Sequence, residues 1–141
     1  MKIRFTTVSK PNFDYAIKGF ELYKKRISYY HDIKTVHFKK TVSDKEILSS
    51  LDNTFLIALS PTGKQFTSHQ LADFLITTSS SSKEISFLVG GPEGLSSSIL
   101  EKANLVWSLG ELTLPHDLAM VVALEAIYRS TTIRLGLSYH K

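Results

Sequence analysis

The stretch Thr54-Phe55-Leu56-Ile57-Ala58-Leu59 is nearly continuous in apolar side chains and does not alternate between apolar and polar residues. A strand with this pattern is typically covered by helices on both faces, because neither face is adapted to water. Sheets covered in this way are mostly parallel, with helices as the connections between strands. Residues 54–59 therefore predict an interior strand of a parallel sheet.

Further strands and helices are predicted to alternate on both sides of this strand. Helices are indicated by apolar residues that recur every three or four positions, several of them preceded by serine or threonine. The alternation predicts an α/β fold, with an open, mostly parallel sheet and helices on both faces, formed by residues 1–141 as a single domain. The predicted strands are 2–8, 34–38, 54–59, 85–89 and 105–108, and the predicted helices are 13–27, 44–51, one beginning at Thr67 or Ser68, 96–102 and 117–134. The segment 60–64 is predicted to be a turn, and 77–82 a polar loop.

The last predicted helix, 117–134, differs from the others because apolar residues lie on nearly all of its sides. One sheet cannot cover all of them, so we expect part of this surface to be buried against a second copy of the chain. The alternative is a helix enclosed within one core, which is difficult to achieve in a chain of 141 residues. The pattern favours a homodimer.

The composition excludes several classes of site. The chain has no cysteine, so disulfides, thiolate metal sites and cysteine nucleophiles are excluded. None of the five histidines occurs in a metal-binding spacing such as H-E-x-x-H, and we expect no metal. Charges near the first residue leave no room for a signal peptide, and the longest apolar run, 118–124, is too short to span a bilayer. We therefore expect a cytoplasmic protein with no membrane segment.

The net charge of +4 is unevenly distributed, because basic clusters occur at 23–26 and 37–40 in the first third of the chain. Such clusters are consistent with an anionic partner. The alternative is that these lysines only keep the end of a helix and the end of a strand solvated.

A glycine-rich turn, Gly90-Gly91-Pro92-Glu93-Gly94, follows the predicted strand 85–89. Ligands of open parallel sheets bind at the carboxyl ends of the strands, and glycine lets the backbone approach a ligand closely. The spacing is not G-x-G-x-x-G, and Gly63-Lys64 is followed by glutamine, so neither a dinucleotide fingerprint nor a P-loop is present. The turn is thus either a ligand site or an ordinary tight turn.

The segment 109–116, Leu109-Gly110-Glu111-Leu112-Thr113-Leu114-Pro115-His116, is a second candidate. Apolar side chains and main-chain groups suit an adenosine-type ligand, and Glu111 is able to accept hydrogen bonds from ribose hydroxyls. The alternative is a plain connector, in which Pro115 and Asp117 begin the next helix.

Several motifs along the chain occur together in a known order and spacing. They are Phe87-Leu88-Val89-Gly90-Gly91-Pro92-Glu93-Gly94-Leu95, Trp107-Ser108-Leu109, Leu112-Thr113-Leu114-Pro115-His116, Glu125 with Tyr128-Arg129, and Tyr139-His140, preceded by Gly19-Phe20-Glu21-Leu22-Tyr23 and by Leu59 with Gly63-Lys64. Over most of its length the chain thereby resembles the family of ribosomal RNA large subunit methyltransferase H (RlmH). The resemblance implies a SPOUT fold with a C-terminal trefoil knot, an exception to the rule that chains are unknotted. It also implies a homodimer that uses S-adenosylmethionine (S-adenosyl-L-methionine) to methylate N3 of a pseudouridine in 23S rRNA, within the assembled ribosome.

The resemblance also implies which residues form the site. By position, the methyl donor would contact Leu59, Gly90, Leu109, Gly110, Glu111, Leu112, Thr113 and Leu114. Methylation requires that N3 lose its proton, which a base or an electrostatic partner near the carbonyl oxygens would assist, and we predict His140 for this role. Tyr139 and Arg129 are predicted to position the RNA. Glu125 and Arg129, four residues apart, equally suit a structural ion pair on a helix.

The sequence departs from the family's pattern at Met120, Leu135, Leu137 and Ser138, which indicates an altered RNA-facing end. Two other functions therefore stay open. One is a non-enzymatic dimeric RNA-binding protein whose basic first third binds phosphate, and the other is a SPOUT methyltransferase that acts on a different RNA position.

Overall fold

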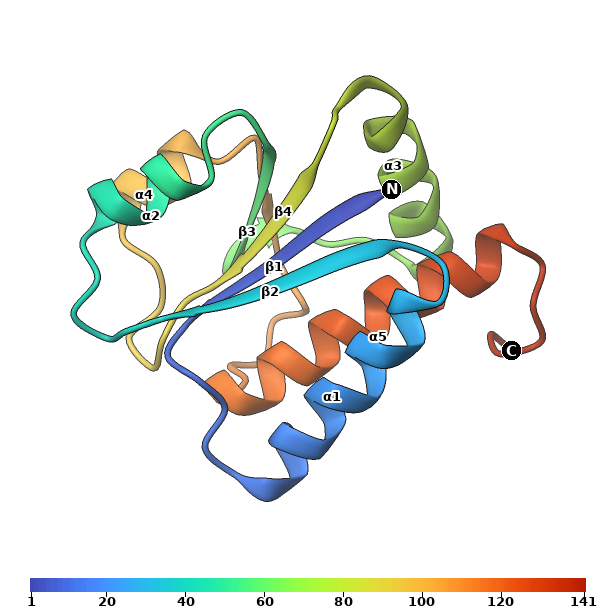
Figure 1. The fold of residues 1–141 in the computed structure, drawn as a ribbon, viewed down its shortest axis with the longest axis horizontal. Coiled ribbons are helices and arrows are strands. Elements are labelled where there is room, and N and C mark those ends of the chain that lie inside the picture. The colour runs from blue at the N-terminus through green and yellow to red at the C-terminus, as the bar shows by residue number, and fades with distance from the viewer.

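In the computed structural model, which describes residues 1–141, five parallel strands form one sheet (Figure 1). Their order is β2-β1-β4-β3-β5, so the strand that was predicted from its continuous apolar run lies inside the sheet. Strand β4 pairs with β1 and β3, and β3 also pairs with β5. The predicted parallel sheet is confirmed. Its strands are β1 (Lys2–Val8), β2 (Asp32–Phe38), β3 (Phe55–Lys64), β4 (Ile85–Val89) and β5 (Leu105–Trp107).

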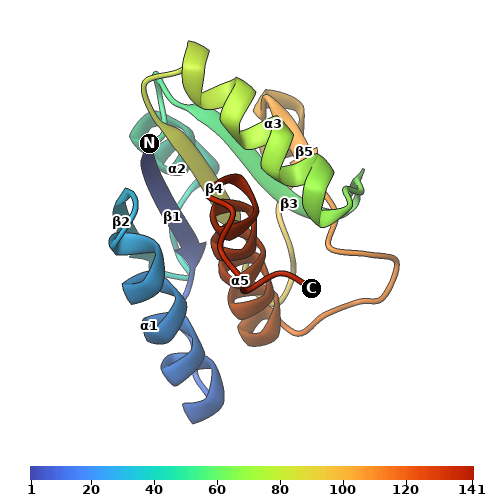
Figure 2. The same cartoon turned by 90° about the vertical axis from the view of Figure 1, so that its right-hand side faces the viewer.

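Helices cover both faces of the sheet, as predicted (Figures 1 and 2). The three long helices lie on one face, with α5 between α1 and α3. The two short helices pack against each other on the opposite face. No helix is long and apolar enough to cross a membrane. The helices are α1 (Asp14–Ser28), α2 (Asp44–Ser50), α3 (Ser68–Ser81), α4 (Ser97–Lys102) and α5 (His116–Arg134).

Each face of the sheet has its own hydrophobic cluster. The larger one joins the sheet to the three long helices and includes Phe5, Phe20, Phe87 and Trp107, whose rings contact one another mostly edge to face. The smaller one joins the sheet to α2 and α4 through residues such as Ile47. Full burial of side chains of this size contributes about 1.5–3 kcal/mol each.

Strand β3 continues through residues 60–64, where a turn was predicted. The pairing with β5 shifts register between Leu59 and Lys64, both of which pair with Trp107. Gly63 lies so close to the neighbouring strand that a Cβ atom there would be 2.5 Å from the carbonyl oxygen of Val106. The absence of a side chain allows this approach, so the strand resumes after an irregular segment.

Helix α3 extends to Ser81, so the predicted polar loop 77–82 is wrong for all but its last residue. The hydroxyl groups of this segment donate to carbonyl oxygens of the preceding turn, with Thr78 Oγ1 at 2.7 Å from the Phe74 oxygen and Ser80 Oγ at 2.7 Å from the Thr77 oxygen. These local bonds satisfy polar side chains within the helix. A run of serine and threonine is therefore compatible with helix here.

Helix α5 buries more of its surface within the chain than the sequence predicted. Met120, Ala123, Leu124 and Ile127 are fully buried in the larger cluster. Between Leu118 and Ile133 no residue of α5 is fully exposed, although several apolar side chains remain partly accessible. The flanking helices α1 and α3 thus cover two sides that were expected to require a partner, and the homodimer stays a prediction. The trefoil knot likewise stays a prediction.

Candidate functional site

A cavity of about 690 Å³ lies at the carboxyl edge of the sheet, where β3, β4 and β5 end. This is the edge at which ligands of open parallel sheets bind. Of the eight residues predicted to contact the donor, seven line it: Leu59, Gly90, Leu109, Gly110, Leu112, Thr113 and Leu114. Glu111 is exposed and does not line the cavity, so its contact with the donor ribose stays a prediction. We call this space the donor cavity.

The glycine turn after β4 forms one wall of the donor cavity. Gly91 and Gly94 are bridged across the turn, and the Gly94 N–H donates to the Gly91 oxygen at 2.9 Å. A Cβ atom on Gly90 would lie 2.7 Å from the backbone carbon of Gly94, so no larger residue fits there. Gly94 adopts a φ of +76°, which favours glycine. The turn thus presents bare backbone to the cavity.

The loop from Leu109 to Pro115 forms the opposite wall. Its first residues are fixed, because Ser108 Oγ accepts from the Gly110 N–H at 3.1 Å and contacts the Gly110 oxygen at 3.0 Å. No hydrogen bond within the chain uses the main-chain groups of residues 111–114. These N–H and C=O groups remain available to the edge of a purine base, which suits the predicted adenosine-type ligand.

His116 and Asp117, the first residues of α5, connect this loop to two others. His116 Nδ1 lies 2.6 Å from the Gly90 oxygen, and its Nε2 lies 3.3 Å from the Ser9 oxygen. The Asp117 carboxylate accepts from the main-chain N–H groups of Asn12 at 2.8 Å and Phe13 at 2.7 Å. We call these four contacts the loop clamp. They hold the β1–α1 loop, the glycine turn and the start of α5 together around the donor cavity.

Asp117 also anchors the residues that lead into α1. Phe13 occupies the N-cap position of that helix and provides no side-chain cap, and the buried Asp117 carboxylate accepts from the N–H of Phe13, which precedes the first helical residue. The sequence suggested only that Asp117 begins its own helix. Its partners lie 104 and 105 positions away, so no local pattern could have indicated the clamp.

The three residues predicted to act on the RNA lie together in a second cluster near the C-terminus. Arg129 donates to the Glu125 carboxylate from Nε at 3.0 Å and from Nη2 at 2.7 Å, and Tyr139 donates to the same oxygen at 2.8 Å. Arg129 Nη1 lies 3.1 Å from His140 Nδ1. The helical ion pair and the gathering of predicted RNA-positioning groups are therefore both present. We call Glu125, Arg129, Tyr139 and His140 the tail cluster.

Hydrogen bonding fixes the protonation within the tail cluster. A guanidinium only donates, so His140 Nδ1 accepts and a neutral His140 carries its proton on Nε2. The hydrogen bond to Glu125 raises the pKa of Arg129, which keeps the guanidinium charged. Burial raises the pKa of Tyr139, and hydrogen bonds with Tyr23 and Glu125 raise it further. The Tyr139 hydroxyl is therefore a donor at neutral pH.

The tail cluster is separated from the donor cavity of the same chain. Glu125 and Arg129 follow His116 by 9 and 13 positions on α5, which corresponds to about 14–20 Å along a helix. The tail folds back along α5 (Figure 1). The ring of His140 contacts His69 at the start of α3. The structure brings the predicted RNA-positioning residues together, but they do not line the donor cavity of the same chain.

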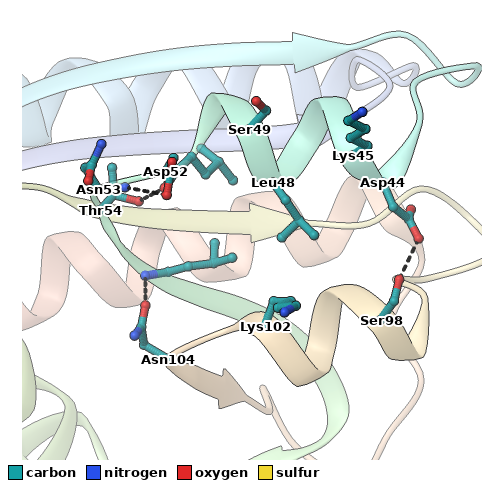
Figure 3. Close-up of a pocket in the computed structure, with 12 residues that line it drawn as sticks. Asp44, Lys45, Leu48, Ser49, Asp52, Asn53, Thr54, Ser98, Lys102 and Asn104 are labelled. Atoms are coloured by element: carbon teal, nitrogen blue, oxygen red, sulfur yellow. Dashed lines mark hydrogen bonds between the residues drawn. The ribbon is translucent and has the colours of Figure 1, made fainter.

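A second hollow, of about 730 Å³, lies between α2 and α4 on the other face of the sheet (Figure 3). Its polar groups are engaged in holding the fold: Asn104 accepts from the Leu56 N–H at 2.7 Å, and Asp44 accepts from Ser96 and Ser98. These two hydrogen bonds lower the pKa of Asp44. The hollow is open and predominantly polar, so the donor cavity remains the better ligand site.

Comparison with known proteins agrees with this geometry. The family described as predicted SPOUT methyltransferase matches residues 1–140. The chain belongs to the SPOUT methyltransferase family. Two relatives are named ribosomal RNA large subunit methyltransferase H. The relative from Deinococcus radiodurans is 41% identical, and the match spans 100% of this chain and 99% of the relative. The relative from Streptococcus gordonii is 35% identical, and the match spans 100% of both chains. The chain belongs to their family as well.

Solved structures show the same SPOUT fold. A probable methylase family protein from Haemophilus influenzae matches 99% of this chain and 70% of its own, with a TM-score of 0.66 and 10% identity. A SpoU methyltransferase from Streptomyces viridochromogenes, solved in complex with the cofactor AdoMet, matches 97% of this chain and 58% of its own, with a TM-score of 0.55 and 13% identity. At these identities the likeness concerns the fold alone. No three histidine, aspartate or glutamate side chains of this SPOUT chain gather as metal ligands.

Proposed function

We propose that this chain is an S-adenosylmethionine-dependent methyltransferase that methylates N3 of a pseudouridine in 23S rRNA. The donor cavity carries the proposal, because it combines bare glycine backbone, free main-chain groups and apolar walls at the carboxyl edge of the sheet. Two proteins of similar fold are solved with AdoMet or SAM bound, which supports the same donor. The name shared by the relatives supports ribosomal RNA as the substrate. We further propose that the chain acts in the cytoplasm, on the assembled ribosome.

The residues of the donor cavity bind and orient. When bound, S-adenosylmethionine supplies an electrophilic methyl group, which the acceptor nitrogen attacks in line with the departing sulfur. Main-chain groups of residues 111–114 would hold the edge of the base, and Leu59 and Leu114 would provide apolar walls. The glycine turn would border the donor with bare backbone. Catalysis by the cavity is then mostly alignment of the two reacting atoms.

The tail cluster assists the acceptor. N3 must lose its proton, which passes to solvent, and this loss places negative charge on the neighbouring carbonyl oxygens of the base. His140 Nδ1 already accepts from Arg129, so its Nε2–H is the group free to donate. We therefore assign His140 the electrostatic role, hydrogen bonding to a carbonyl oxygen, rather than that of the base. Tyr139 and Arg129 hold His140 and the RNA in position.

Because the tail cluster lies about 14–20 Å along α5 from its own cavity, we propose that it acts at the cavity of the partner subunit in a homodimer. Exposed apolar side chains support such a dimer. These side chains, which are 42–81% exposed, are Tyr15, Ile17 and Leu22 on α1 and Leu112 at the mouth of the cavity. A second copy of the chain would bury them together with the accessible part of α5.

A mixed-dimer experiment tests the arrangement. Gly90→Ala damages the cavity and His140→Ala damages the tail, so each homodimer should be at least tenfold slower than wild type in single-turnover methylation at a donor concentration well below the wild-type Kd. Co-expressed as a mixed dimer, they recreate one complete site if the tail acts on the partner, and activity should recover to about half of wild type. No recovery would refute action in trans, and normal activity of the His140→Ala homodimer would refute the role of His140.

Two further measurements test the reaction itself. Titration with S-adenosylmethionine should raise the melting temperature, because a ligand that binds only the folded state stabilises it. No response would favour a non-enzymatic RNA-binding protein. Mass spectrometry of rRNA from a deletion strain should reveal the loss of one methyl group on a 23S pseudouridine, and loss at another position would redirect the proposal to a different RNA site.

A further inference from the structure

Four lysines surround the carboxyl ends of β1 and β2, beside the donor cavity. Lys10 follows β1, Lys24 lies on α1, and Lys39 and Lys40 follow β2. Burial lowers the pKa of His37, which lies among them, and the positive charges of Lys10 and Lys24 lower it further. We call Lys10, Lys24, Lys39 and Lys40 the basic rim. Three of its members, Lys10, Lys39 and Lys40, are exposed to solvent.

The basic rim is continuous with the donor cavity. The Ser9 N–H donates to the Phe38 oxygen at 2.7 Å, which joins the loop that carries Lys10 to the end of β2. The Ser9 oxygen also contacts His116 of the loop clamp at 3.3 Å. Ser96 Oγ, which follows the glycine turn, donates to the Asp44 carboxylate at 2.6 Å, so the segment after β2 and the segment after the glycine turn meet where α2 and α4 begin. A strand of nucleic acid that leaves the cavity on the side of β1 and β2 would therefore pass this rim.

The charge of the basic rim is not neutralised within the chain. The two salt bridges of the structure join Arg4 to Glu84 and Arg129 to Glu125, and neither involves a rim lysine. Glu21 is the acidic group that acts on His37 from this region, and the positive charges of Lys10 and Lys24 oppose it. The hollow of Figure 3 differs, because Lys45 and Lys102 share it with Asp44 and Asp52. The excess of positive charge is thus localised at the edge of the sheet where the cavity opens.

We infer that the basic rim binds backbone phosphates of the RNA strand on one side of the nucleotide that is methylated. This inference rests on the proposed function, since it assigns a surface to the same substrate. Lysine ammonium groups on exposed loops are able to contact phosphates without a fixed geometry, which suits positioning of a strand and not reading of its sequence. Such contacts release counterions, so binding should weaken steeply with salt.

The test compares two charge-reversal variants with equal net charge. Lys39→Glu/Lys40→Glu changes the rim. Lys2→Glu/Lys83→Glu changes two exposed lysines at the opposite edge of the sheet, where Lys2 is the first residue of β1 and Lys83 precedes β4. Methylation of ribosomes from a deletion strain is measured at several KCl concentrations, together with ribosome binding by sedimentation and S-adenosylmethionine binding by calorimetry. The rim variant should raise KM about tenfold and lower the slope of log KM against log salt by about 1–2. The control should change KM less than twofold.

Three other outcomes overturn the inference. An unchanged KM and salt slope in the rim variant would show that these lysines do not contact the RNA. An equal loss in the control would show that only overall charge matters. A weakened affinity for S-adenosylmethionine would show that the rim acts through the cavity. If wild-type protein binds ribosomes but does not methylate them, the proposed function fails, and the sedimentation data for the same variants still decide the role of the rim.

Discussion

Replacement of Asp117 by alanine tests whether the loop clamp holds the donor cavity together. The change removes the acceptor of two hydrogen bonds, from Asn12 N–H at 2.8 Å and Phe13 N–H at 2.7 Å, to a carboxylate whose residue is only 3% exposed. A hydrogen bond to a charged group contributes about 1.5–3 kcal/mol. Asn12 and Phe13 are exposed, so water partly replaces the lost acceptor. We expect the free energy of unfolding to fall by about 3 kcal/mol, and the melting temperature by about 10 °C.

The affinity for S-adenosylmethionine should fall as well, because Phe13 lines the cavity and loses its anchor. Urea unfolding measures the stability, and calorimetry below the melting temperature measures the affinity. Asp117→Asn keeps one carbonyl acceptor and should lose about half as much stability. Asp14→Ala, at an exposed acid in the first turn of α1, is the matched control and should change stability by less than about 0.5 kcal/mol. A loss below 1 kcal/mol in Asp117→Ala with unchanged affinity would refute the clamp.

Two further predictions concern the glycine turn and His31. Gly90→Ala places a Cβ atom 2.7 Å from the Gly94 backbone, so the turn must shift. Calorimetry should show at least a tenfold loss of S-adenosylmethionine affinity in a protein that still unfolds cooperatively. Wild-type affinity would contradict the close approach. Burial, with the charges of the N-terminal amine and Arg134, lowers the pKa of His31 from 6.5 to about 4. The unfolded chain therefore binds the extra proton between these values, and the free energy of unfolding should fall as the pH falls from 6.5 to 4, by about 1–2 kcal/mol after allowance for partial exposure. Urea unfolding at pH 7 and pH 4.5 should show this loss in wild type and a smaller one in His31→Gln; equal losses would contradict the assignment.

The amino-acid pattern was sufficient for the class of fold. The continuous apolar run of β3 requires helices on both faces, and this requirement is local, since it depends only on the apolar character of neighbouring side chains. The glycine turn and the segment 109–116 were candidate ligand sites with ordinary structural alternatives; the family resemblance assigned them to the donor, and both line the donor cavity. The family resemblance added the donor and the substrate, which no periodicity could supply.

Errors in the prediction arose where long-range contacts or unusual local bonds decided the structure. Residues 60–64 extend because Gly63 packs against the backbone of β5, a partner more than forty residues later. Residues 77–81 stay helical because their hydroxyls bond to the preceding turn and not to water. Composition alone favoured a turn and a loop at these two places.

Only the tertiary structure decided how the functional groups are distributed. It tied Asp117 to Asn12 and Phe13, and it placed His140 beside Arg129 at a distance from its own cavity. It also collected lysines from three separate segments into one basic rim. The physical reason is that side-chain patterning records which residues avoid water, whereas hydrogen bonds and charges act between groups that only the folded backbone brings within a few ångströms.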